Sequence, residues 1–254
     1  MIIKVLASGS KGNCSYLEIA NKRFIIDIGI TYSRLTKNLA NIGLTIDDIN
    51  GLFLTHTHKD HILGLAVLVK HSHFPIYIKE GMYGEIEDIL PKDRIIYYQD
   101  EMTIENKINL FVIPTSHDAP DSVGFLFDFE GHNLVYITDT GYINRKYLSL
   151  LKDKEIYYME SNHDEKMLMD GPYPYHLKQR IIGDKGHLSN EAASNYLGKL
   201  IGKNTKYIIL AHLSEHNNTE SLAYEALKNK LTEISFDPAI IIAKQNEASE
   251  KVEV

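Results

Sequence analysis

The chain has 254 residues, of which 44% are hydrophobic and 24% are charged, a composition typical of a globular protein with a sizeable core. Its 27 basic and 34 acidic residues give a net charge of −7, which argues mildly against a long basic face for a polynucleotide but leaves a local basic groove open. The longest apolar runs, such as Ile62 to Val69, are too short to span a bilayer.

Two further features of the sequence point to a cytoplasmic protein. No signal-peptide pattern precedes the first strand-like run. The single cysteine, Cys14, has no partner for an internal disulfide, and no nucleophile signature surrounds it. We therefore expect Cys14 to be a small buried residue and the protein to be cytoplasmic, without membrane association.

Short strand-like runs alternate with helical patterns along the chain. Strands are predicted where β-branched and aromatic residues lie between turn residues. Helices are predicted where apolar residues recur three or four positions apart, as Leu35, Leu39 and Ile42 do before Gly43. In chain order, we expect strands at 2–7, 14–19, 24–28, 51–54, 74–78, 94–98, 110–113, 124–129, 134–138, 156–159 and 207–211, with helices at 31–42, at 60–69 (capped by Asp60), at 191–201 and at 220–231.

The connections between these elements indicate the class of fold. Helices interleaved with strands favour an α/β architecture with covered sheets. Tight hairpins, such as the one expected at 130–133, favour mixed rather than parallel sheets. Because no linker or repeat interrupts the pattern, we expect one domain over 1–254, with a frayed, charged tail at 245–254.

The segment Thr55 to His61 is the most informative stretch of the chain. Three histidines and an aspartate fall between positions 56 and 61, after an apolar strand and before an apolar helix. Neutral imidazole and carboxylate groups are ligands that divalent metals such as zinc prefer. His56 and His58 alternate along an extended segment, so both side chains can point the same way, whereas Asp60 and His61 follow the bend. This density of ligands predicts a metal site rather than a polar loop.

Further ligands are expected at the ends of other strands, where loops converge on one edge of a sheet. His117, Asp139 and His212 each come after a strand-like run, and Asp27 lies near the same edge. Taken singly, each could equally be a metal ligand, a residue that caps a helix or a structural histidine. Together with the histidine cluster they favour a shared metal centre.

The order of these residues resembles that of the metallo-β-lactamase superfamily, and the resemblance covers nearly the whole chain. It implies an αββα sandwich, with two mixed sheets flanked by helices and the metals at one edge. It also implies two divalent ions, Zn²⁺ first and Mn²⁺ as the alternative. By implication, His56, His58 and His117 hold one ion, Asp60, His61 and His212 hold the other, Asp139 bridges both, and Asp27 orients ligands through hydrogen bonds.

The sequence resembles the phosphodiesterase branch of this superfamily, namely the YycJ/WalJ-like hydrolases and, more distantly, RNase Z. By likeness to RNase Z, His187 is expected to protonate the leaving oxygen and Glu160 to orient it, although a purely structural pair stays possible. The loop Ser8 to Asn13 is glycine-rich, and a plain tight turn is its expected role rather than phosphate binding. The strings that carry the resemblance are residues 7–13, 116–119, 160–164, 186–190 and 211–215.

The resemblance implies a dinuclear phosphodiesterase that hydrolyses a nucleotide by a metal-bound hydroxide, with Asp60 helping to position the attacking water. A small 3′,5′-cyclic mononucleotide, the substrate of phage anti-Pycsar proteins, is the expected substrate because the chain is acidic and compact. No RNase Z-like arm is evident between Asp139 and His212. The alternative is a YycJ/WalJ-type 5′–3′ DNA exonuclease, and a non-catalytic metal-binding protein is less favoured. A homodimer is expected because these relatives tend to pair.

Overall fold

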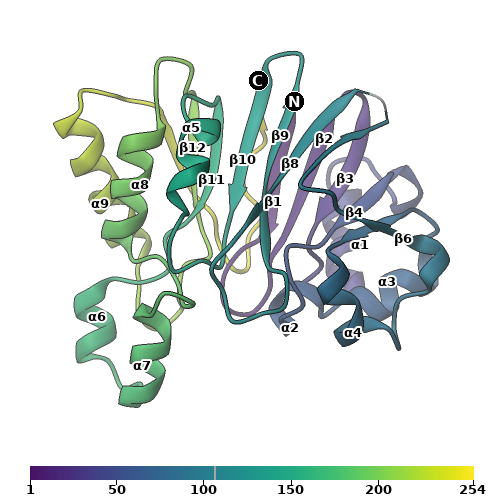
Figure 1. Ribbon diagram of the computed structural model, residues 1–254, viewed down its shortest axis with the longest axis horizontal. Coiled ribbons are helices and arrows are strands. Elements are labelled where there is room, and N and C mark those ends of the chain that lie inside the picture. Colours follow the sequence, from purple (N-terminus) through teal and green to yellow (C-terminus); the bar gives the residue numbers. More distant parts are fainter. Residues whose placement is uncertain (106) are drawn as a thin grey trace.

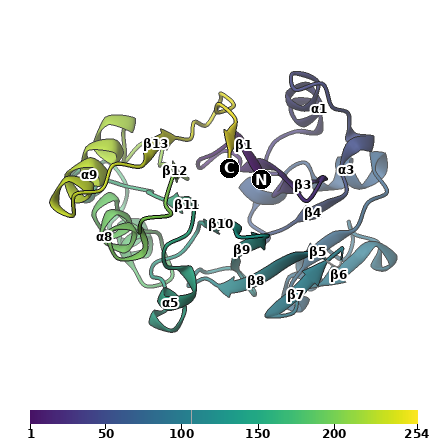
Figure 2. The same ribbon diagram turned by 90° about the horizontal axis from the view of Figure 1, so that it is seen from above.

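The structure is a computed structural model that describes residues 1–105 and 107–254. Two seven-stranded sheets pack face to face, and helices cover the outer face of each sheet, as Figures 1 and 2 show. The predicted αββα sandwich with two mixed sheets is therefore confirmed. None of the described helices is long and apolar enough to cross a membrane.

The first sheet has the strand order β14-β1-β2-β3-β4-β5-β6. Its first hairpins are antiparallel, whereas β3 to β6 run parallel and need crossover connections. Helices α1 and α3 lie in two of these connections on the outer face (Figure 2). The bounds are β1 Ile2–Ala7, β2 Cys14–Ile19, β3 Lys22–Ile26, α1 Tyr32–Ala40, η1 Ile46–Asp48, β4 Gly51–Phe53, α2 Lys59–Ile62, α3 Leu65–His71, β5 Ile76–Ile78, η2 Glu80–Met82, α4 Tyr83–Ile86, η3 Lys92–Arg94, β6 Ile95–Tyr97 and β14 Val252–Glu253.

The second sheet has the order β13-β12-β11-β10-β9-β8-β7. Strands β7 to β10 form an antiparallel meander, and β10 to β13 run parallel. Helices α5, α8 and α9 lie on its outer side (Figure 1). The bounds are β7 Glu101–Ile104, β8 Ile108–Pro114, β9 Val123–Phe129, β10 His132–Ile137, η4 Arg145–Tyr147, α5 Leu148–Leu151, β11 Ile156–Glu160, α6 Glu165–Asp170, α7 Tyr175–Ile182, α8 Asn190–Leu200, β12 Tyr207–Ala211, α9 Glu220–Glu233 and β13 Ala239–Ile242.

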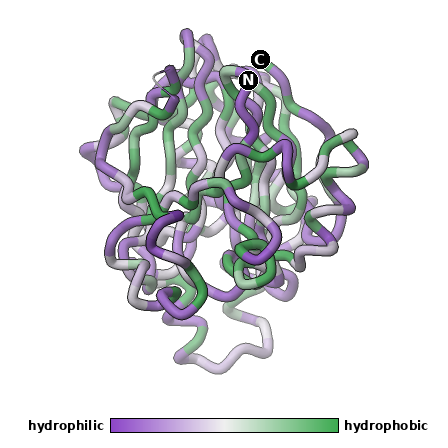
Figure 3. The backbone as a smooth tube through the Cα atoms, turned by 90° about the vertical axis from the view of Figure 1, so that its right-hand side faces the viewer, coloured by the Kyte–Doolittle hydropathy of each residue, from purple (hydrophilic) through white to green (hydrophobic). Residues whose placement is uncertain are grey.

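Strand periodicity explains how one sheet serves two cores. In β10, Leu134 and Tyr136 pack into the core between the sheets, whereas Val135 and Ile137 pack under the outer helices. Tyr136 stacks on Tyr158 of β11 with ring centroids 4.0 Å apart. Figure 3 shows hydrophobic residues gathered along the strands and hydrophilic ones in many of the connecting segments.

The predicted helix over 60–69 is wrong as a single element. It is divided into α2 and α3, and Gly64 lies between them. A Cβ atom at Gly64 would lie 2.3 Å from the carbonyl oxygen of Ile30, so only glycine allows this close approach. The predicted cap is also wrong, because His58 occupies the N-cap position of α2 and Asp60 lies within its first turn.

The prediction of a frayed tail at 245–254 is likewise wrong. Strand β14 pairs with β1 and extends the first sheet, with Val252 buried. The backbone N–H of Ser249 donates to the carbonyl of Val5, and that of Val254 donates to the carbonyl of Met1. These main-chain bonds hold the two ends of the chain side by side, as Figures 1 and 2 show.

Candidate metal centre

The predicted ligands converge on one edge of the sandwich. Strands β8, β10, β11 and β12 point in the same direction, so their carboxyl ends meet at this edge. The carboxyl ends of β3 and β4 in the first sheet contribute the opposite side. All seven proposed ligands lie here, in overlapping groups whose ligand atoms are within 4.8 Å of one another: His56, His58, Asp60, His61, His117, Asp139 and His212.

The first group consists of His56, His58 and His117. His58 Nδ1 and His117 Nε2 lie 3.2 Å apart. The Nε2 atom of His56 is buried and has no hydrogen-bond partner among the described residues. A buried polar atom without a partner costs about 1–3 kcal/mol, so this ring fits a bound cation better than an apolar pocket.

The second group consists of Asp60, His61 and His212. Asp60 Oδ2 lies 3.5 Å from His61 Nε2 and 3.4 Å from His212 Nε2. Asp139 contacts members of both groups, with Oδ2 3.3 Å from His61 Nε2 and Oδ1 3.8 Å from His117 Nε2. The two groups and the carboxylate between them have the donor set of a dinuclear metal site.

Asp27 is buried behind the second group and holds one ligand in place. Its Oδ2 atom is 2.8 Å from His61 Nδ1, and its two oxygens accept hydrogen bonds from the N–H and hydroxyl of Thr55. The Nδ1 atom of His61 is therefore occupied, and its Nε2 atom faces Asp60 and Asp139 at the edge where the proposed ligands meet, called here the metal edge. Burial alone lowers the pKa of His61, but the carboxylates of Asp139, Asp27 and Asp60 raise it overall to about 10. This accumulation of buried negative charge also fits cations.

Glu160 connects the metal edge to His187. Its Oε1 atom is 2.6 Å from His187 Nδ1 and 3.1 Å from His212 Nδ1. Its Oε2 atom accepts the backbone N–H groups of Leu188 and Thr140. Burial tends to raise the pKa of Glu160, but His187 and the hydrogen bonds lower it to about 2. Glu160 is charged and occupies the Nδ1 atom of His187. The ring of His187 lines the cleft, so its Nε2 atom is the nitrogen left for a substrate.

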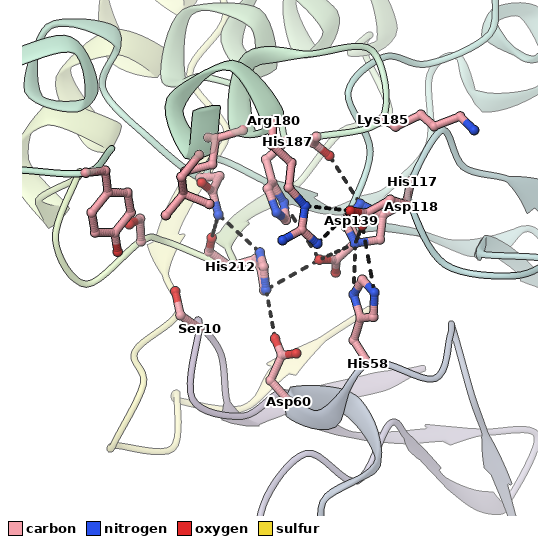
Figure 4. Close-up of a pocket in the computed structure, with 16 residues that line it drawn as sticks. Ser10, His58, Asp60, His117, Asp118, Asp139, Arg180, Lys185, His187 and His212 are labelled. Atoms are coloured by element: carbon pink, nitrogen blue, oxygen red, sulfur yellow. Dashed lines mark hydrogen bonds and ion pairs between the residues drawn. The ribbon is translucent and has the colours of Figure 1, made fainter. Parts of the chain in front are cut away.

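A cleft opens over the two groups of ligands (Figure 4). His58, Asp60 and His117 line it from one side. The segment around α7, which the sequence did not predict as a helix, lines it from the other with Arg180 and Lys185 among its residues. The cleft thus gives a substrate access to both metal groups and to His187.

Asn13 also contacts the second group, although the sequence did not single it out. Its Nδ2 atom is 3.2 Å from Asp60 Oδ2 and 3.0 Å from His61 Nε2, and its Oδ1 accepts the N–H of Gly9. In the same loop, Ser8 Oγ accepts the N–H of His212 at 2.8 Å. The loop Ser8 to Asn13 is therefore more than the predicted tight turn, because it contacts three ligands of the second group. The sequence offered one sign of this role, because residues 7–13 are among the segments that resemble the family.

A two-sheet sandwich with histidine and aspartate ligands at the carboxyl edge of its strands defines a class of metal-dependent hydrolases, those of the metallo-β-lactamase fold. Residues 22–212 match the family model described as the Beta-lactamase superfamily domain, and the chain belongs to that superfamily. Exodeoxyribonuclease YycJ of Bacillus anthracis is 35% identical over 236 residues, which cover 91% of this chain and 89% of that protein. Exodeoxyribonuclease WalJ of Streptococcus pneumoniae serotype 2 is 33% identical, covering 90% and 87%.

Solved structures confirm the fold at lower identity. The metallo-β-lactamase fold protein YhfI of Bacillus subtilis superposes with a TM-score of 0.72 at 17% identity, covering 98% of this chain and 99% of that one. The short form of human tRNase Z gives 0.63 at 15% identity, covering 98% and 99%. Together with the relatives above, these matches confirm the predicted superfamily and a metal-dependent phosphodiesterase. Of the two predicted substrates, the relatives favour DNA, the alternative prediction, over a cyclic mononucleotide.

Proposed function

We propose that this protein is a metal-dependent exodeoxyribonuclease. The observation that carries the proposal is the 35% identity to exodeoxyribonuclease YycJ over nearly the full length of both chains. The described cleft adds support, because two cationic side chains, Arg180 and Lys185, line it and can contact the phosphates of a DNA strand. The 5′–3′ direction expected for this branch belongs to the same proposal.

The chain's own residues suit two divalent ions. His56, His58 and His117 would hold one, Asp60, His61 and His212 would hold the other, and Asp139 contacts members of both groups. Zn²⁺ suits this set of imidazoles and carboxylates, and Mn²⁺ is the alternative. When bound, such ions supply a water of lowered pKa and neutralise charge on the phosphoryl oxygens.

Two side chains then act on the reacting atoms, and a third positions one of them. Asp60 accepts a hydrogen bond from the attacking water and orients it, since its carboxylate lines the cleft. His187 donates a proton to the leaving oxygen from the nitrogen that faces the cleft. Burial alone lowers the pKa of His187, but the carboxylate of Glu160 raises it overall, which favours the protonated donor. Glu160 also holds the ring of His187 in place by accepting the hydrogen bond from its Nδ1–H group.

Turnover of a substrate panel tests this function. The protein, loaded with Zn²⁺ or Mn²⁺, is incubated with single- and double-stranded DNA and RNA, labelled at either end, and with cyclic CMP, UMP, AMP and GMP. Stepwise loss of nucleotides from the 5′ end of DNA is expected. Hydrolysis of a cyclic nucleotide with the DNA left intact contradicts the proposal. The protein would then be a phosphodiesterase for cyclic mononucleotides.

The oligomeric state and location stay predictions. A homodimer is expected by likeness to the phosphodiesterase branch, and light scattering at working concentration tests it. A monomer in that measurement removes the prediction. Cell fractionation tests the predicted cytoplasmic location.

A further inference from the structure

Helix α7 has no buried residue, so the hydrophobic core does not explain its position. It follows α6, and Figure 1 shows both helices projecting beyond the sheets at the end where α2 also lies. Leu177 and Ile181 turn toward the cleft and line it. Helix α7 thus forms one wall of the cleft without burying a residue in the core.

Two cationic side chains line this wall. Both Nε and Nη2 of Arg180 lie 2.6 Å from Asp118 Oδ2, and the side chain is still 61% exposed. Asp118 in turn lies 3.5 Å from the first-group ligand His117. Arg180 is thus one residue away from the metal ligands. In Figure 4 it extends from α7 toward Asp118.

Lys185 lies farther along the same wall. It is exposed, and within residues 1–105 and 107–254 its ammonium group makes no ion pair or hydrogen bond. Figure 4 shows its side chain extending past His117, away from the cluster of ligands. A cation that points away from the ligands can meet a second anionic group.

Aromatic side chains lie beside the same helix. Tyr173 lines the cleft, and Tyr175, the first residue of α7, is 71% exposed. Tyrosine rings are platforms on which the bases of a single strand stack, and cations elsewhere along the same cleft can contact its backbone. The wall therefore suits a nucleotide chain better than a lone phosphate.

We propose that α7 and the following loop form a strand-binding wall, in which Arg180 and Lys185 bind phosphates next to the scissile one. This inference rests on the proposed nuclease function and narrows its substrate to a chain with at least one phosphate beyond the scissile bond. A cyclic mononucleotide has a single phosphate and leaves Lys185 without a role. Asp118 neutralises Arg180 until the strand arrives, and a phosphate then replaces that carboxylate as its partner.

The experiment compares two substrates in the metal-loaded protein. One is a single-stranded DNA oligonucleotide, and the other is thymidine 5′-nitrophenyl phosphate, a diester without a neighbouring phosphate. For Arg180→Ala and Lys185→Ala we expect kcat/KM to fall about tenfold on the oligonucleotide, with little change on the nitrophenyl diester. The matched control is Lys178→Ala, because Lys178 lies on α7 but donates to the carbonyl of Met169.

A second measurement separates phosphate binding from a structural tie between α7 and Asp118. Binding of a cleavage-resistant phosphorothioate strand is followed by fluorescence anisotropy at several salt concentrations. Each alanine variant should lower the salt slope by about 0.7, the value for one lost contact to a single strand, and Arg180→Lys should restore most of it. Asp118→Asn, in contrast, should keep or raise the affinity because it frees Arg180.

The outcomes distinguish this inference from the proposed function. If the wild-type protein degrades DNA but both alanine variants behave like Lys178→Ala, the strand-binding wall is wrong and the nuclease function stands. The same holds if Asp118→Asn weakens binding as much as Arg180→Ala, since Arg180 then acts only as a tie. If the wild-type protein cleaves no oligonucleotide, both proposals are overturned.

Discussion

At the residue scale, three of the residues at the metal edge have unusual backbone conformations. Asp27, Asp139 and His212 all have positive φ angles, of 59°, 53° and 55°. Non-glycine residues adopt this left-handed region at a cost of about 1 kcal/mol or more each. Each of them comes just after a strand, and the sharp change of direction coincides with a side chain that faces the cluster. The strain therefore coincides with the cluster of polar side chains, as is typical of functional sites.

The first prediction separates a metal ligand from a proton donor. Asp139→Ala should lose bound metal, because this carboxylate contacts ligands of both groups. His187→Ala should keep both ions but slow hydrolysis of DNA by roughly 10²–10⁴, the usual contribution of a general acid. Metal content by elemental analysis and single-turnover kinetics measure the two effects.

A good leaving group supplies the control for this pair. A nitrophenolate needs little protonation, so His187→Ala should be far less harmful with a nitrophenyl phosphodiester than with DNA. If both substrates are slowed equally while metal content stays full, His187 is not the acid and serves to shape the cleft.

The second prediction concerns Asn13, whose amide touches Asp60 and His61. Residues that orient metal ligands change affinity by about 10–100-fold when they are replaced. Asn13→Ala should therefore weaken the second ion by about that factor and leave the ion at His56, His58 and His117 largely unchanged. Calorimetric titration of the metal-free protein resolves the two sites.

Lys11→Ala is the matched control for Asn13→Ala, because Lys11 lies in the same loop but pairs with the exposed Glu215. This control should retain both affinities. Equal weakening of both ions by Asn13→Ala would mean that the loop supports the whole edge rather than the second group.

At the scale of elements, the sequence predicts best what local pattern determines. The bounds predicted for β1, β2 and β12 agree with the structure because buried strands of β-branched residues between turn residues leave little choice of register. Strand β13 was missed because it is short and half-exposed, and strand β7 because polar residues interrupt it. Helices α6 and α7 were missed because they are short and bury almost nothing, so their apolar residues give only a weak pattern.

The same distinction applies to the site. The proposed ligands could be predicted to lie together because His56, His58, Asp60 and His61 are close in the sequence and the others follow strands. Asn13 and Arg180 were missed because their partners are distant in the chain, 47 positions away at Asp60 and 62 at Asp118. Such pairings depend on how the loops pack, which spacing alone does not determine.

The third prediction concerns the contribution to stability of the residue that directly precedes β11. Glu155 is buried there and pairs with Lys206 before β12 at 2.6 Å and with His132 of β10 at 2.9 Å. Burial tends to raise the pKa of Glu155, but these two partners lower it overall below its ordinary value of 4.5. A lowered carboxylate pKa stabilises the fold above the ordinary value, and this contribution is lost as the pH falls through the lowered one.

Glu155→Gln should therefore lower the free energy of unfolding by about 1–2 kcal/mol at pH 7 and by less at pH 3. Urea denaturation at both pH values measures this difference. The exposed pair of Lys228 and Asp237 provides the comparison, and Asp237→Asn should change stability much less. An equal loss at both pH values would show that shape rather than charge matters at Glu155.

At the scale of the whole molecule, the metal edge joins the two halves of the sandwich. Asp27 and the residues from His56 to His61 belong to the side of the first sheet. In the second sheet, Glu160 ends β11, and His117, Asp139 and His212 follow strands. Bound cations would therefore connect two sheets that otherwise meet through their apolar faces. Metal binding and stability should be linked throughout the molecule.

The last prediction is that chelation destabilises the entire fold. Without cations, the buried carboxylates of Asp27, Asp139 and Glu160 have only histidines as positively charged partners among the contacts of the described residues. An ion at 100 times its dissociation constant stabilises the folded state by about 2.7 kcal/mol, which corresponds to roughly 5–10 °C in Tm for a domain of this size. Calorimetric scans with Zn²⁺ and with EDTA should show this shift in one cooperative transition, since the ligands come from both sheets. Asp139→Ala should melt near the chelated wild type and respond little to EDTA, whereas a wild-type Tm that is unchanged after proven loss of metal would contradict the link.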